Sequence, residues 1–395
     1  MGISIDHEGL VECTRELVKI PSVFDPSTGR NEQSAAAFIA ELLSGFGWSP
    51  VIDQVAPGRP NVICMVEGGL PGPTLCFEGH TDVVTEGDTA LWTHDPFGAH
   101  IVDGRLYGRG SADMKSGLLA GMFATHALSR AGTFPGRIVI AALVDEEGMM
   151  TGAKQFVANG FAAGVDAAIC CEPEGGEICH VAKGALRLRI GFRGAMAHGA
   201  MPFMGRNPNR AVGEFLLRLV SLQDDLQATH VTDMYLGDVW VTPTVLRAGT
   251  PVQMNVMPAD AEVWVDVRTI PGVDHAGLCA RIHALALASG ESSGVVADLD
   301  VIDDRPAVST AEGSLLVQSV LRAHEAVLGT PGVLGGVPGA TDGTVLTSRT
   351  GMPTVVYGPG GKWIAHQADE FVELADISRH AEVYAEAALR FLSAS

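Results

Sequence analysis

Apolar positions follow a βαβ-like pattern at both ends of this 395-residue chain. Short apolar runs rich in β-branched residues alternate there with longer segments in which apolar residues recur at helical spacing. The strand-like runs are 61–66, 74–77, 137–144, 166–171 and 354–357, and the helix-like segments are 8–19, 116–130, 152–159, 313–328 and 377–392. Because strands that alternate with helices form βαβ units, we predict an α/β domain with a mainly parallel sheet and helices on both faces.

The middle of the chain has a different pattern. Apolar and polar residues alternate with a period of two over 186–193 and 263–268, which is expected of antiparallel strands with one solvent-facing side. Helical spacing returns over 209–222 and 275–288. We therefore predict a discontinuous catalytic domain, residues 1–182 and 303–395, that carries an inserted α+β domain, residues 183–302.

Composition and charge narrow the class of protein. A hydrophobic content of 47% with 18% charged residues is typical of a packed globular chain. The net charge of −20 argues against binding to nucleic acid or to an anionic membrane, both of which need a basic surface. The N-terminal segment has no secretory pattern, and no apolar stretch is long enough to cross a membrane. Seven cysteines without a CxxC pair fit buried, reduced thiols, so we expect a soluble cytoplasmic protein.

Residues that can bind metals follow the predicted strands. His80 comes after 74–77, Glu146 and Glu147 after 137–144, Glu172 after 166–171, Asp113 after a glycine-rich loop, and His366 beyond 354–357. Because the carboxyl ends of parallel strands meet at one edge of a sheet, we expect these side chains to converge. Each alone has an ordinary alternative: a surface histidine, an N-cap aspartate or a solvated acidic turn.

The acidic run 145–147 also favours a metal. Three adjacent carboxylates at the end of a buried strand repel one another and lose hydration, and a divalent cation is the simplest compensation. Asp82 lies two residues after His80, so its carboxylate is expected to accept a hydrogen bond from the far imidazole nitrogen. A serine hydrolase and a P-loop protein are disfavoured, because no GxSxG follows a strand and no GxxxxGK[ST] occurs.

Together these motifs resemble the acetylornithine deacetylase and succinyl-diaminopimelate desuccinylase family of zinc amidohydrolases, which includes glutamate carboxypeptidases and related dipeptidases. The matching segments are GHTDVV at 79–84, W-x-x-DPF at 92–97, LYGRGSADMKSG at 106–117, DEEG at 145–148, CEP at 171–173 and AHQADEFV at 365–372. They occur in the family's order across essentially the whole chain. Ala185, where relatives often have serine or threonine, and Met149 and Met150, in place of a glycine-rich continuation, depart from the pattern.

The resemblance implies a centre of two divalent metal ions, zinc by default, with cobalt and manganese as alternatives. His80 and Glu172 would bind one ion, Glu147 and His366 the other, and Asp113 both. Two metals bridged by one carboxylate lie about 3.5–4 Å apart, close enough to share a water. The peptide bond after Asp113 is often cis in relatives, and the same is expected here.

The resemblance also assigns catalytic and substrate-binding roles. Glu146 would be the general base that activates the metal-bridged water, and Asp82 would orient His80. His198 would stabilise the oxyanion, in its own site or in that of a partner subunit. The predicted substrate-binding positions are Asn255, Arg268, Gly339 and Thr341. The guanidinium of Arg268, on the polar side of its strand, suits a bidentate grip on a carboxylate.

The function implied is hydrolysis of the amide bond of an N-acyl amino acid or a related carboxylate-bearing amide. A dipeptidase or glutamate-releasing carboxypeptidase with the same dizinc centre is the alternative within enzymes, and a non-catalytic metal-binding or scaffold protein is the alternative outside them. The expected partners are a small acylated amino acid or dipeptide-like substrate and a second copy of the chain. The homodimer would form through the inserted domain, with the alternating strand 186–192 as the candidate for edge-to-edge pairing between two copies.

Overall fold

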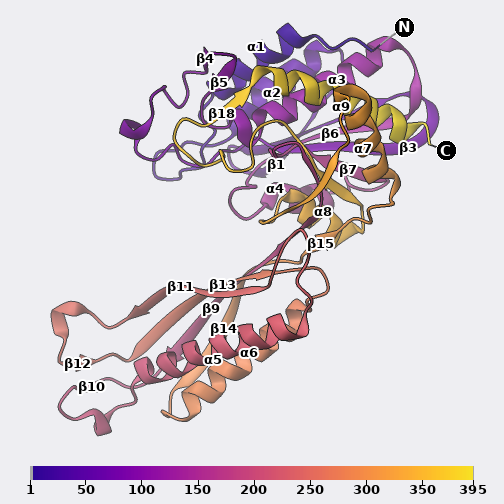
Figure 1. The fold of residues 1–395 in the computed structure, drawn as a ribbon. Coiled ribbons are helices and arrows are strands. Elements are labelled where there is room, and N and C mark those ends of the chain that lie inside the picture. Colours follow the sequence, from indigo (N-terminus) through magenta and orange to yellow (C-terminus); the bar gives the residue numbers. More distant parts are fainter. Residues whose placement is uncertain (1–2, 395) are drawn as a thin grey trace. The chain divides into compact units, whose positions relative to one another are not determined.

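The computed structural model describes residues 3–394, which form two compact units. The first unit takes in the chain up to His180, Ser309–Val337 and the chain from Thr341 onward. The second unit comprises Val181–Val308 and Pro338–Ala340. Figure 1 shows the elements of each unit in sequence colours.

A nine-stranded mixed sheet forms the centre of the first unit, in the order β1-β2-β6-β3-β7-β17-β8-β15, with β16 paired to β8. Its strands are β1 (Val51–Ala56), β2 (Arg59–Glu67), β3 (Gly69–His80), β6 (Phe134–Leu143), β7 (Ala167–Cys170), β8 (Glu177–Ala182), β15 (Val308–Ser309), β16 (Val333–Val337) and β17 (Thr354–Val356). The central strands β6, β3, β7 and β17 pair in parallel. Strands β1, β2 and β8 pair antiparallel. The predicted parallel sheet is thus confirmed for the centre, and its flanks make the whole sheet mixed.

Helices cover both faces of this sheet (Figure 1). The helices are α1 (His7–Val18), α2 (Gln33–Gly45), α3 (Ser116–Ala131), α4 (Thr151–Ala158), α7 (Leu315–Leu328), α8 (Asp342–Thr350) and α9 (Leu374–Leu392). Side chains alternate across β6, so Ile138 and Ile140 join one large core with α1, α2, α3, α7 and α9. Val139 and Ala141 are also buried but belong to the opposite face, where α4 and α8 pack together. Burial on both faces explains why the central strands are almost continuously apolar.

The second unit is a four-stranded antiparallel sheet with two helices on one face. The sheet has the order β11-β13-β9-β14. Its elements are β9 (Gly184–Arg193), β11 (Trp240–Ala248), β13 (Asp260–Thr269), β14 (Val296–Arg305), α5 (Pro208–Thr229) and α6 (His275–Glu291). A short pair, β10 (Ala197–His198) with β12 (Val256–Met257), lies apart from this sheet. The even-numbered apolar residues of β9 join the core beneath α5 and α6, as the period-two alternation predicted.

Several elements were not predicted. They include α2, α8 and a three-stranded sheet of β4 (His100–Val102), β5 (Arg105–Tyr107) and β18 (Phe371–Glu373). Single helical turns occur at Thr89–Leu91, Pro202–Met204 and Pro251–Gln253, and an irregular turn with non-helical backbone angles at Asp113 and Met114 spans Ser111–Lys115. The pairing of β5 with β18 matters for the site, because it brings the segment after His366 beside the loop that carries Asp113. Within the described residues, no helix combines the length and apolar character that crossing a membrane requires.

Candidate metal centre

The predicted metal ligands converge at the carboxyl ends of the parallel strands. His80 is the last residue of β3, Glu147 follows β6, and Glu172 follows β7. These three strands are neighbours in the sheet, so their ends meet at one edge. Asp113 lies in the turn before α3, and His366 lies in the loop between β17 and β18. The cis peptide bond expected after Asp113 is present.

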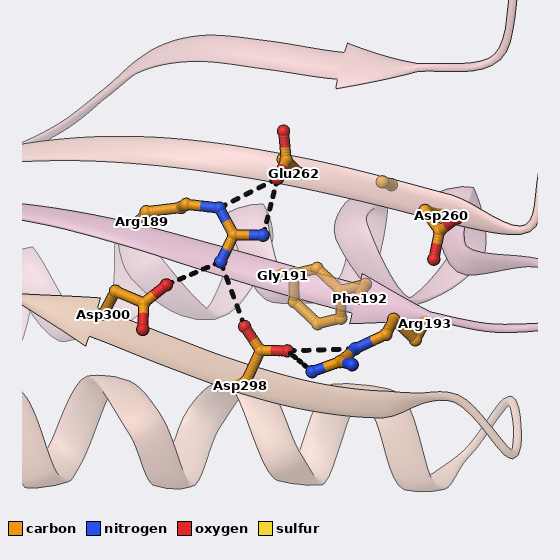
Figure 2. A pocket seen from close by; sticks show the side chains of 9 residues that line it. Arg189, Gly191, Phe192, Arg193, Asp260, Glu262, Asp298 and Asp300 are labelled. Atoms are coloured by element: carbon orange, nitrogen blue, oxygen red, sulfur yellow. Dashed lines mark hydrogen bonds and ion pairs between the residues drawn. The ribbon is translucent and has the colours of Figure 1, made fainter.

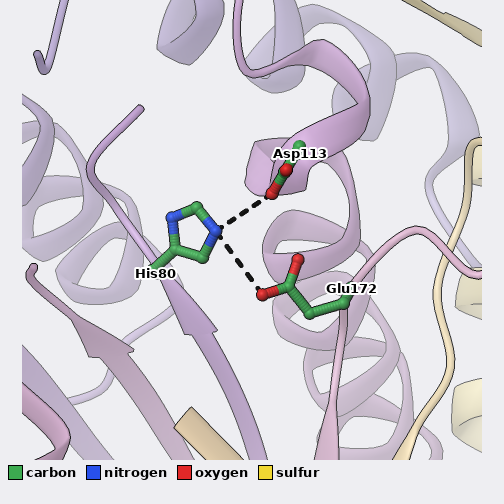
Figure 3. Close-up of side chains that lie close together, drawn as sticks. All are labelled: His80, Asp113 and Glu172. Carbon is green, nitrogen blue, oxygen red and sulfur yellow. Dashed lines mark hydrogen bonds and ion pairs between the residues drawn. The ribbon is translucent and has the colours of Figure 1, made fainter. Parts of the chain in front are cut away.

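Two groups of ligands share one aspartate. In the first group, Nε2 of His80 lies 3.1 Å from Oδ1 of Asp113 and 3.5 Å from Oε1 of Glu172 (Figure 3). In the second, Nε2 of His366 lies 2.8 Å from Oε1 of Glu147 and 3.3 Å from Oδ2 of Asp113. Within each group the ligand atoms lie within 4.8 Å of one another. The two oxygens of Asp113 therefore face different imidazoles, as a carboxylate that bridges two metal ions would.

The chemistry of these donors fits two divalent cations. Burial and the neighbouring Asp113 carboxylate raise the pKa values of Glu147 and Glu172, because like charges crowd together away from water. The carboxylates of Asp113 and Glu147 raise the pKa of His366 to about 10. Two imidazoles and three carboxylates, without thiolate, match the preferences of zinc, cobalt and manganese. Their charge of −3 is balanced by two divalent ions with one positive charge to spare.

Asp113 does not cap helix α3, so the alternative of an N-cap aspartate is wrong. The N-cap of α3 is Lys115, and no side chain caps this helix. The amine of Lys115 is buried and donates hydrogen bonds to the carbonyls of Leu17 and Ile20 at the end of α1. These hydrogen bonds of Lys115 hold the turn before α3 against the end of α1. The Asp113 carboxylate faces the imidazoles of His80 and His366.

The role predicted for Asp82 needs correction. Nδ1 of His80 lies 2.8 Å from the backbone carbonyl of Asp82, whereas the carboxylate is 3.6 Å away. The carbonyl is the closer acceptor and fixes the tautomer that leaves Nε2 for a metal. The Asp82 carboxylate accepts hydrogen bonds from the backbone amides of Glu146 and Glu147, both at 3.2 Å. Its side chain therefore positions the acidic turn.

The acidic run does not act as one metal-binding unit. Asp145 accepts a hydrogen bond from the guanidinium of Arg59 at 2.9 Å and another from the hydroxyl of Thr151 at 2.7 Å. Its charge is thus compensated by an arginine. Glu146 and Glu147 remain on the site side, and each has a carboxylate oxygen within 4.8 Å of a ring nitrogen of His80. Their shared turn brings Glu146 close to the predicted metal ligands.

The buried ion pair of Glu370 with Arg109, which no sequence pattern indicated, supports Asp113. Oε1 of Glu370 accepts hydrogen bonds from the backbone amides of Ala112 and Asp113, both at 3.0 Å. Oε2 accepts a hydrogen bond from Arg109 at 2.5 Å, and Glu370 is fully buried. Glu370 follows His366 by four residues, so one segment supplies a predicted ligand and supports Asp113, the predicted shared one. The motif AHQADEFV contained this glutamate, but only the fold shows what it contacts.

Glu370→Gln is expected to weaken metal binding about 10–100-fold, the usual cost of losing an outer-shell partner. The amide keeps one acceptor oxygen but leaves the buried guanidinium of Arg109 without its carboxylate, which costs about 3–5 kcal/mol of stability. Metal titration of the stripped protein measures the first effect, and urea denaturation measures the second. Glu373→Gln is the control, because Glu373 pairs with Arg105 at an exposed site. Equal metal affinities in the two variants would contradict the assigned role.

The other predicted site residues divide between the units. Thr341 is buried at the start of α8, and Gly339 lies in the short segment Pro338–Ala340 of the second unit. The pairing of β10 with β12 brings His198 and Asn255 together, and the amide of Gly199 donates to the carbonyl of Asn255 at 2.7 Å. Nε of Arg268 lies 2.7 Å from Oδ1 of Asp266. A substrate carboxylate would thus compete with Asp266 for this guanidinium.

A second polar cluster lies on the helix-free face of β9, β13 and β14 (Figure 2). Arg189 contacts Glu262, Asp298 and Asp300 at 2.5, 3.1 and 2.7 Å. Arg193 contacts Asp298 at 2.5 Å. These charges satisfy one another on a partly exposed surface. The cluster links strands and offers no free nucleophile or metal-ligand set.

The mixed sheet and the ligands at its carboxyl edge define the class of protein as a metal-dependent hydrolase. The chain belongs to the peptidase family M20/M25/M40, whose model matches residues 76–390. The sequence resemblance to amidohydrolases of this type is thereby confirmed.

Individual relatives agree with this assignment. A succinyl-diaminopimelate desuccinylase from Cereibacter sphaeroides is 31% identical over 385 residues, which cover 95% of this chain and 96% of that protein. The aminopeptidase PepT from Bacillus cereus has the same fold, with a TM-score of 0.79 and 21% identity over 99% of this chain and all of that one. The YXEP protein of Bacillus subtilis, described as a dinuclear metal-binding peptidase of the M20 family, gives a TM-score of 0.73 and 20% identity over 98% of this chain and 99% of its own.

Proposed function

We propose that this chain hydrolyses the amide bond of an N-acyl amino acid or a related carboxylate-bearing amide. The observation that carries the proposal is the pair of ligand groups that share Asp113, with Glu146 beside them. His80, Glu172 and Asp113 would hold one ion, and Glu147, His366 and Asp113 the other. We propose zinc as the metal. When bound, two divalent cations would polarise the scissile carbonyl and lower the pKa of water towards neutrality.

The residues around this centre divide the remaining work. Glu146 takes a proton from the attacking water and passes it to the leaving nitrogen. Asp82 keeps Glu146 in place through the backbone amide contact. Arg268 and Asn255 recognise the carboxylate or carbonyl of the substrate, and His198 stabilises the oxyanion. The segments that contain Gly339 and Thr341 contact the substrate.

Removing the metals is expected to abolish hydrolysis, and zinc or cobalt should restore it. The physical reason is that the metals would supply both the lowered pKa of the attacking water and the polarisation of the scissile carbonyl. The measurement is the rate before chelation, after dialysis against a chelator, and after addition of zinc, cobalt or manganese. Metal-stripped protein that keeps its full rate would eliminate the proposed chemistry.

A substrate screen decides what the enzyme releases. N-acetyl amino acids, N-succinyl amino acids and dipeptides should be compared at equal concentration with each metal. Preference for acylated amino acids supports the proposal. Preference for dipeptides or for release of C-terminal glutamate points to the peptidase alternative with the same centre, and no hydrolysis of any of them points to a non-catalytic protein.

We also propose that the second unit acts as a lid and forms a homodimer. The strand 186–192, from which the sequence suggested pairing, belongs to β9 and lies between β13 and β14, so it has no free edge. The edges of this sheet are β11 and β14 instead, and edge strands offer backbone groups that a second copy can pair with. Sedimentation at micromolar concentration tests this. A monomer alone would reject the dimer without affecting the metal centre.

A further inference from the structure

A lysine occupies a second cluster of metal-type ligands in the first unit. Glu174, Glu177 and Cys179 offer ligand atoms that lie within 4.8 Å of one another. Nζ of Lys362 lies 2.7 Å from Oε2 of Glu174 and 2.9 Å from Oε2 of Glu177. It also lies 3.0 Å from the carbonyl oxygen of Gly336. A longer contact of 3.8 Å reaches Sγ of Cys179. The three oxygen acceptors match the three N–H donors of an ammonium group.

This lysine joins segments that are distant in the sequence. Glu174 follows the predicted ligand Glu172 by two residues, Glu177 begins β8, and Gly336 belongs to β16. Lys362 itself lies in the loop between β17 and β18, four residues before His366. A backbone contact reinforces the connection, because the amide of Gly175 donates to the carbonyl of Gly360 at 3.0 Å. The loop that carries His366 is thus held against the segment that follows Glu172, a predicted ligand of the other group.

The loop of His366 needs such a fastening. His80 is held in a strand and is fully buried, whereas the side chain of His366 is 52% exposed and its backbone has a φ of 64°. A non-glycine residue in the left-handed region is unfavourable unless its surroundings hold it there. The side chain of Lys362 is only 14% exposed and its partner Glu174 only 5%, so their contact is largely shielded from water. Removing one partner of such a shielded pair leaves the other as an uncompensated buried charge, whereas removing one partner of an exposed pair costs little.

We infer that Lys362 is a positioning residue of the metal centre: its ammonium takes the place of a cation among Glu174, Glu177 and Cys179 and holds the loop so that His366 can bind its metal. The inference rests on the proposed function, because it assumes a metal between His366, Glu147 and Asp113. It predicts that the two metal sites respond differently: loss of Lys362 should weaken metal binding at His366 more than at His80 and Glu172.

The test is cobalt titration of the metal-stripped full-length protein, followed by visible absorption and calorimetry. Wild-type protein should bind two ions in two steps, and His366→Ala identifies which step belongs to His366. Lys362→Met should weaken that same step about 10–100-fold and change the other step much less. The double variant Lys362→Met with His366→Ala should bind cobalt little more weakly than His366→Ala alone, because both changes act on the same metal site. Lys19→Met, which removes an exposed pair with Glu16, is the control.

A buried Glu174 without its lysine can destabilise the fold, so the double variant Lys362→Met with Glu174→Gln is measured as well. It leaves no uncompensated charge at Glu174, and circular dichroism reports whether it folds. Unchanged cobalt binding in either folded variant overturns the inference, and so does equal weakening of both steps. Wild-type protein that binds fewer than two ions contradicts the proposed function instead, so the two failures are distinguishable.

Discussion

Replacing Glu146 with glutamine is expected to lower kcat roughly 10²- to 10⁴-fold, the usual contribution of a general base. The amide has nearly the same size and keeps the contacts of its backbone, but it cannot accept a proton. Glu146 has a carboxylate oxygen close to His80 and Glu147, on the side of the acidic turn that faces the two ligand groups. A rate loss of this size corresponds to about 3–5 kcal/mol of transition-state stabilisation.

The metal content of the Glu146 variant separates its two possible roles. We expect two ions per chain in both wild-type and variant protein, because the five proposed ligands, Asp113 among them, are unchanged. Glu67→Gln is the matched control, since Glu67 is an exposed glutamate at the end of β2. Turnover at the wild-type level would exclude Glu146 as the base. A variant that loses an ion together with its activity would make Glu146 a ligand.

Asp113→Asn is expected to lose more than any other single ligand replacement. One carboxylate oxygen faces His80 and the other faces His366, and asparagine replaces one of these oxygens with an NH2 group and removes the charge. The affinity for both ions should fall by over roughly 100-fold, which exceeds the loss of affinity expected when an outer-shell partner is removed. Hydrolysis should fall with metal occupancy.

Metal analysis after gel filtration measures this loss. Asp103→Asn is a suitable control, because Asp103 is exposed in a turn with a φ of 51°, a conformation that asparagine tolerates. If the Asp113 variant retains two tightly bound ions, the aspartate does not bridge them. If it retains one ion at full affinity, Asp113 belongs to a single site, and the arrangement of two groups around one carboxylate is wrong.

Much of the first unit followed from the periodicity of its sequence. Central strands such as β6 and β7 are apolar on both faces, and α9 has an apolar stripe, so their types were predicted from local residues alone. Helix α8 was not predicted, because it starts at Asp342-Gly343 and contains several threonines, which favour helices weakly. Its burial against β7 and β17 supplies the missing stability.

The sequence by itself determined the central strands, most of the long helices and the identity of the groups that meet at the sheet edge. Those features depend on neighbouring residues, since the end of a buried strand fixes where the next side chain points. The tertiary structure alone decided how the groups are held. The Asp113 amide and Glu370 are 257 residues apart, and Lys362 meets Glu177 from 185 residues away. Such contacts depend on chain closure and on angles that no local pattern records, so whether Asp82 offers its carbonyl or its carboxylate to His80 was decided only by the folded backbone.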